Sequence, residues 1–151
     1  MKPGFKERLL NYCEEILQDR IAVSQASIDN AQAAANEEEK SSAGDKYETS
    51  RAMSHIEKDM YARQLLANKT EMAALQTIDC KSRLKEITTG SFIECSNFKF
   101  FIAAGLGKVE FEGQTIFFIS PNAPLAFVLF KRKKGEIFLF NKENIRILDI
   151  F

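Results

Sequence analysis

The first half of the chain begins with a long stretch in which apolar residues recur at the three- and four-residue steps of one helix face. This stretch predicts a helix from Phe5 to about Lys40, because it also contains neither proline nor glycine. The predicted apolar seam thins from leucine and isoleucine to alanine, and consists of Leu10, Leu17, Ile21, Ile28, Ala31 and Ala35.

A second periodic stretch predicts a return helix from Thr49 to about Asp79. Its predicted seam is formed by Met53, Ile56, Met60, Ala67, Ala74 and Ile78, widened by Leu65, Met72 and Leu75. A helix of about 35 residues is on the order of 50 Å long. Two such helices joined by a short turn make an antiparallel helical hairpin, which is a coiled coil.

The one break between the two helices is the segment 41–51, which we call the tip of the hairpin. Gly44 tolerates the positive φ that ends many helices. Asp45 and Glu48 follow it, three residues apart, at the start of the return helix. Spacing alone leaves two interpretations open. Asp45 can be the N-cap of the return helix with Glu48 at N3, or the two carboxylates can serve another molecule from the tip.

The hydrophobic period changes after a hinge at residues 80–89, and alternating apolar residues bounded by turn residues predict strands. They are expected around Phe92, at 98–102, 109–112 and 115–120, and at 137–140 and 145–150, with a short helix over 125–130. The predicted fold class is therefore α+β. Residues 1–80 form the hairpin with its acidic tip, and residues 81–151 form a small antiparallel sheet domain with one short helix.

Charge and composition agree with two modules. Residues 1–80 carry 14 acidic and 10 basic side chains, whereas residues 81–151 carry 7 acidic and 11 basic ones. Of the 13 phenylalanines, all but Phe5 lie beyond residue 90. No apolar run is long enough to span a membrane and no secretory signal is visible, so no membrane association is expected. Three cysteines without a CxxC pair argue against disulfides and zinc and favour the cytoplasm.

Two further features carry weaker chemical signals. His55 is the only histidine and lies among polar residues of the return helix, which predicts a solvent-facing side chain. With no second His and no adjacent Cys, it builds neither a zinc site nor a nucleophile, so a self-contained active site is not expected. The basic run Lys131–Lys134 is either a solvated turn or a contact for nucleic acid.

Three local sequences bear a resemblance to a known family. The tip reads Gly44-Asp45-Lys46-Tyr47-Glu48-Thr49, and the second half contains Ile119-Ser120-Pro121-Asn122-Ala123-Pro124-Leu125 and then Lys133-Lys134-Gly135-Glu136. In this order, over nearly the whole chain, they resemble the Gre family of bacterial transcript cleavage factors. The tip motif of that family is Gly-Asp-x-Ser-Glu-Asn, so the Gly, Asp and Glu are in register. Tyr47 and Thr49 stand where the family has Ser and Asn.

The resemblance implies an FKBP-like C-terminal domain and a monomer that binds RNA polymerase. The loop with Asn122, Ala123 and Pro124 would grip the polymerase beside its secondary channel, and the hairpin would enter that channel. Asp45 and Glu48 would help the polymerase hold a second Mg²⁺, which this chain does not bind stably alone, and position a water. The polymerase itself, rather than this chain, would then cut backtracked RNA near its 3′ end.

Tyr47 and Thr49 keep a second function open: a regulator that binds the channel, competes with cleavage factors and stimulates no cleavage. A third possibility is unrelated to polymerase, namely a coiled-coil adaptor whose sheet domain binds another protein.

Overall fold

The computed structural model describes residues 4–40 and 44–151, with the side chains of residues 38–40 and 44–48 left out of the description. The chain divides into two compact units. One unit comprises residues 15–72, which lie in the two long helices, and the other comprises residues 1–14 together with 73–151. We call them the hairpin unit and the sheet unit. The domain boundary at residue 80 stays a prediction, because compactness does not establish independent folding.

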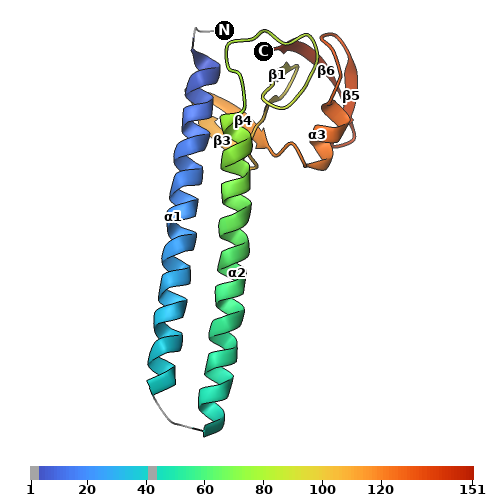
Figure 1. Cartoon of the computed structure of the whole chain (residues 1–151). Coiled ribbons are helices and arrows are strands. Elements are labelled where there is room, and N and C mark those ends of the chain that lie inside the picture. Colours follow the sequence, from blue (N-terminus) through green and yellow to red (C-terminus); the bar gives the residue numbers. More distant parts are fainter. Residues whose placement is uncertain (1–3, 41–43) are drawn as a thin grey trace. The chain divides into compact units, whose positions relative to one another are not determined.

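Two long helices confirm the predicted hairpin. Helix α1 spans Phe5–Lys40 and helix α2 spans Gly44–Gln76. Within the hairpin unit the two helices lie side by side and run antiparallel (Figure 1). Because α2 begins at Gly44, Asp45 lies inside the helix, and its predicted role as the N-cap is wrong. The return helix therefore begins at Gly44 rather than at the predicted Thr49, because a glycine at the start of a helix does not prevent helical backbone.

The seam of α1 is close to the prediction, whereas the seam predicted for the return helix is confirmed near the sheet unit and wrong toward the tip. The confirmed residues are buried or half-buried, namely Leu65, Met72, Ala74, Leu75 and Ile78. The predicted residues Met53, Ile56 and Met60 are 59%, 68% and 46% exposed. Most buried and half-buried positions of α2 instead form one stripe at alternating steps of four and three residues: Ser54, Lys58, Tyr61, Leu65, Asn68, Met72 and Leu75.

The physical reason for this seam lies near the end of α2, where Met72 and Leu75 are buried. A stripe that continues from them at helical steps passes through position 54, and position 53 is turned from it by about 100°. The polar groups on this stripe find partners across the hairpin. Lys58 Nζ donates to Gln32 Oε1 at 2.6 Å, and Asn68 Nδ2 donates to Ser24 Oγ at 3.5 Å.

The sheet unit contains a six-stranded sheet with the strand order β3-β4-β2-β1-β6-β5. The pair β2–β4 is parallel, and every other pair is antiparallel. The strands are β1 (Phe92–Cys95), β2 (Lys99–Ile102), β3 (Gly107–Phe111), β4 (Gln114–Ile119), β5 (Ile137–Phe140) and β6 (Glu143–Ile150), and the short helix α3 (Pro124–Leu129) lies between β4 and β5. The predicted α+β fold class, a helical hairpin followed by a sheet domain with one short helix, is confirmed. The prediction of a purely antiparallel sheet is wrong, because β2 and β4 are joined through β3 rather than by a hairpin and pair in parallel.

Both faces of the sheet are covered within the sheet unit. On one face, Ile93, Phe100 and their neighbours form a core with Ala126 and Leu129 of α3. On the other face, aromatic rings of the first turns of α1 pack on aromatic rings of the strands. Phe5 lies 5.3 Å from Phe92, and Tyr12 lies 5.4 Å from Phe111 and 5.8 Å from Phe118, between ring centroids. The first turns of α1 therefore belong to the core of the sheet unit.

Neither of the two long helices nor α3, taken over the described residues, is long and apolar enough to cross a membrane.

Candidate functional site

The tip carboxylates predicted from the sequence lie at the start of α2. Asp45 and Glu48 occupy the first turn of this helix, at the end of the hairpin where the chain passes from α1 to α2. Positions three apart lie on one face of a helix, so the backbone puts both residues on a common side. Their side chains are among those outside the description.

The residue types around the tip suit a hard cation. Between residues 37 and 48 the sequence has five acidic residues and two lysines. Mg²⁺ is commonly held by one or two carboxylates together with waters and phosphate oxygens. Within the part of the chain that the structure describes, no group of three or more His, Cys, Asp or Glu side chains is placed to hold a metal.

The second predicted contact is the loop before α3. Ser120 organises it, because its Oγ accepts the amide of Asn122 at 3.2 Å and its carbonyl accepts the amide of Ala123 at 3.0 Å. Ala123 is the N-cap residue of α3, and Pro124 is at the start of the helix. Asn122 and Pro124 are exposed, and Ala123 is half-buried. This loop is thus a fixed, accessible turn, which suits contact with a partner.

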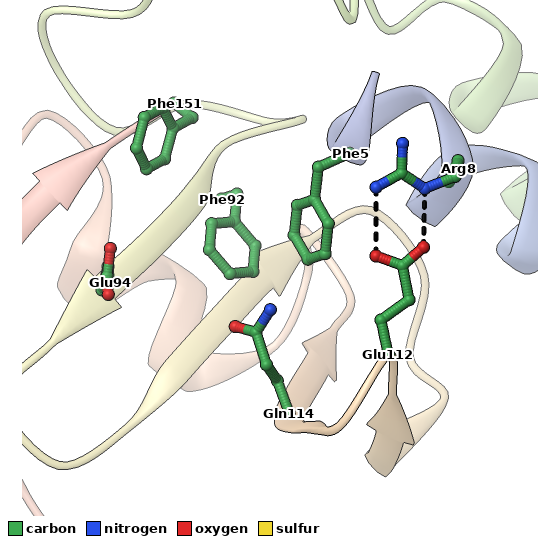
Figure 2. A pocket seen from close by; sticks show the side chains of 7 residues that line it. All are labelled: Phe5, Arg8, Phe92, Glu94, Glu112, Gln114 and Phe151. Atoms are coloured by element: carbon green, nitrogen blue, oxygen red, sulfur yellow. Dashed lines mark hydrogen bonds and ion pairs between the residues drawn. The ribbon is translucent and has the colours of Figure 1, made fainter. Parts of the chain in front are cut away.

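A cleft of about 750 Å³ in the sheet unit was not foreseen from the sequence (Figure 2). Its apolar lining is formed by Phe5, Phe92 and Phe151, and its polar lining by Arg8, Glu94, Glu112 and Gln114. These residues come from α1, β1, the β3–β4 turn, β4 and the last residue of the chain. Because the lining residues come from segments that are far apart in the sequence, they form no sequence motif. The many phenylalanines beyond residue 90 were the one sequence signal for aromatic packing in the sheet unit.

The charges at the rim of this cleft are largely compensated. Arg8 donates through Nε to Glu112 Oε1 at 2.6 Å and through Nη2 to Oε2 at 3.1 Å, and this carboxylate raises the pKa of Arg8 (Figure 2). Gln114 Oε1 accepts from Lys99 Nζ at 2.7 Å. The seven lining residues include carboxylates, a guanidinium, an amide and phenyl rings, and no thiol, hydroxyl or imidazole. The lining can contact a ligand through charged, amide and aromatic groups.

Lys6 is a buried cation in the sheet unit. Its side chain is 3% exposed, and its Nζ donates to the carbonyl of Phe151 at 3.1 Å. Burial lowers the pKa of Lys6, while the charges of Asp79 and Cys80 act in the opposite direction. His55, by contrast, is exposed on α2, as predicted.

The fold and the candidate residues together define an α+β protein with a helical hairpin and a mixed sheet. No protein-family model and no curated protein matches the chain. Among solved structures, the chain is similar to one titled "Structure of the transcription factor Gfh1", with a TM-score of 0.39 and 16% identity over 91% of this chain and 92% of that chain. At these values the likeness does not by itself support a function.

Proposed function

We propose that this chain is a Gre-like transcription factor that binds the secondary channel of RNA polymerase and stimulates the polymerase to cleave backtracked RNA. The observation that carries the proposal is the placement of Asp45 and Glu48 in the first turn of α2, at the end of a two-helix hairpin. The Gly-Asp-x-x-Glu register of the tip and the two matching motifs in the second half support it.

The chemistry of the proposal needs a partner. Two carboxylates on one helical turn do not make a water-excluding pocket, which is what makes electrostatic catalysis strong. Asp45 and Glu48 would supply carboxylate oxygens inside the polymerase active site, and they would orient a water against the RNA phosphate. A Mg²⁺ bound there would supply Lewis-acid stabilisation of the charge that develops on the phosphate. The loop with Asn122 and Pro124 would fix the sheet unit on the outside of the channel.

The decisive experiment is an RNA cleavage assay on backtracked polymerase complexes. We expect the wild-type chain to shorten the RNA, and the double variant Asp45→Ala with Glu48→Ala to lose this activity while still binding polymerase. The matched control is Glu57→Ala with Asp59→Ala, which removes two exposed carboxylates from the same helix away from the tip. A double tip variant that cleaves like wild type would show that the tip assignment is wrong.

A second function is favoured by one specific observation, the presence of Tyr47 and Thr49 where the family has Ser and Asn. In this alternative the chain occupies the channel and competes with cleavage factors without shortening RNA at any Mg²⁺ concentration. The double variant Tyr47→Ser with Thr49→Asn then gains cleavage activity that the wild-type chain lacks. Failure of the wild-type chain to bind core polymerase would contradict both functions and favour the coiled-coil adaptor.

A further inference from the structure

Two basic segments that lie far apart in the sequence are joined in the sheet unit. The Ile87 amide donates to the Arg132 carbonyl at 2.9 Å, and the Lys131 amide donates to the Ile87 carbonyl at 2.9 Å. Glu86 and Lys133 form an antiparallel bridge beside them. Residues 83–87 and 131–134 therefore run next to each other.

A groove of about 410 Å³ lies beside this junction. It is lined by the basic residues Arg83, Lys85 and Lys134, together with Leu84, Asp149 and Ile150. All three basic side chains are exposed. Lys134 Nζ lies 3.9 Å from Asp149 Oδ1, and the Lys134 side chain is 70% exposed, so this ion pair is weak.

We call Arg83, Lys85, Lys131, Lys133 and Lys134 the basic surface. The nearby acidic residues are Glu86, Glu136 and Asp149, so the surface keeps a positive excess. Apart from Lys134, its side chains make no hydrogen bond or ion pair with any described residue. Arg132 is different, because its Nε donates to the Val128 carbonyl at 2.6 Å and its Nη1 to the Ile137 carbonyl at 3.3 Å. Arg132 holds the turn in place, and the five other cations are left for a ligand.

An exposed aromatic ring lies close to these charges in the sequence. Phe127 is on α3, four residues before Lys131, and is 66% exposed. Its ring packs edge-on against Phe130, with 6.1 Å between centroids, which steadies it. Proteins that bind single strands typically use cations, which meet the phosphates, together with exposed rings, on which bases stack.

We propose that the sheet unit binds single-stranded nucleic acid, with phosphates along the basic surface and a base stacked on Phe127. Duplex DNA is disfavoured, because its bases are already stacked and present no free face to Phe127. This binding is separate from the proposed polymerase contact and does not require it.

Fluorescence anisotropy with the full chain and a labelled single-stranded 20-mer, as RNA and as DNA, tests the proposal. With about five phosphate contacts, the slope of log K against log salt should be about −3.5, which weakens binding roughly 130-fold between 50 and 200 mM salt. Lys85→Gln with Lys133→Gln should reduce the magnitude of the slope by about 1.4. Phe127→Ala should weaken binding at least about 5-fold and leave the slope unchanged.

The matched control is Lys69→Gln with Lys108→Gln, which removes the same charge from exposed positions outside the basic surface and should bind like wild type. The proposal is overturned if the 20-mer does not bind at 50 mM salt, or if the Lys85 and Lys133 double variant binds like the control. An unchanged affinity of Phe127→Ala overturns the stacking contact.

Vesicles of phosphatidylcholine with 30% phosphatidylserine test the alternative ligand. If the chain binds these vesicles and does not bind the 20-mer, the basic surface is assigned to lipid. The assay contains no polymerase, so its outcome is independent of the cleavage test.

Discussion

Gly90 lies directly against the side chain of Ile78. A Cβ on Gly90 would stand 2.6 Å from Cγ2 of Ile78, closer than two carbon atoms pack, and Gly90 has a φ of +92°. Its amide also donates to the carbonyl of Ile102 at 2.6 Å. The segment that follows α2 therefore packs on the segment before β1 at a point where only glycine is accommodated.

Gly90→Ala should lower the free energy of unfolding by about 2–4 kcal/mol, because backbone strain and a steric clash add together. Gly113→Ala is the matched control, since Gly113 has a φ of +77° and nothing within 4 Å of the added methyl group. It should cost only the backbone strain, about 1 kcal/mol. Denaturant unfolding measures both values. Equal costs would mean that the contact with Ile78 contributes nothing.

The observed seam of the hairpin predicts unequal effects for two apolar residues. Leu17 is fully buried, whereas Ile56 is 68% exposed. Leu17→Ala should destabilise by about 2–4 kcal/mol through lost burial and a cavity. Ile56→Ala should change stability by less than about 0.5 kcal/mol, because little apolar area is lost and Ala favours helix. If Ile56→Ala proved as costly as Leu17→Ala, the seam through Met53, Ile56 and Met60 would be the correct one.

Lys6 should make stability rise with pH on the alkaline side. Burial holds its pKa below the ordinary 10.5, so between the two values the unfolded chain binds more protons at this residue than the folded chain. The free energy of unfolding therefore increases with pH in that window. The increase should be smaller in Lys6→Met, compared from pH 7 to pH 10.5 by urea unfolding. Lys108→Met, an exposed control, should keep the wild-type pH dependence.

The three cysteines should differ in their reaction with a maleimide. Cys13 and Cys95 are buried, and Cys80 is partly exposed. Burial, with the charge of Glu94, raises the pKa of Cys95 to about 12. Its thiolate fraction near neutral pH is then about a thousandfold below that of an ordinary thiol. Mass spectrometry of partly labelled native protein should find Cys80 modified first. Early labelling of Cys95 would contradict the packing of β1.

Local features of the sequence predicted the elements well. Helix α1 has the predicted bounds Phe5–Lys40, because nothing in that stretch interrupts the helical period. Strand β5 also matches its predicted range, 137–140, because a basic turn precedes it. The placement of Asp45 and Glu48 at the start of the return helix agrees with the structure, although their roles remain predictions.

Relations between segments were harder to predict. On α2, the stripe through Met53 is more apolar than the stripe through Ser54. The helical period of the sequence does not show which stripe is buried, and it is the burial of Leu65, Met72 and Leu75 that places Ser54 in the seam. Alternation marks a strand without naming its neighbour, so the parallel β2–β4 pair was not foreseen. The cleft beside Arg8 and the basic groove beside Lys85 both depend on such pairings.

The rings of Phe5 and Tyr12 have a consequence for how the protein is made. The sheet unit requires residues from both ends of the chain, since β1 pairs with β6 and the first turns of α1 cover its strands. During synthesis on the ribosome, residues 5–14 emerge first but can dock only after the strands that carry Phe92, Phe111 and Phe118 have been made. A fragment cut at residue 81 would lack these rings and leave Phe92, Phe111 and Phe118 open to water, so it would tend to aggregate.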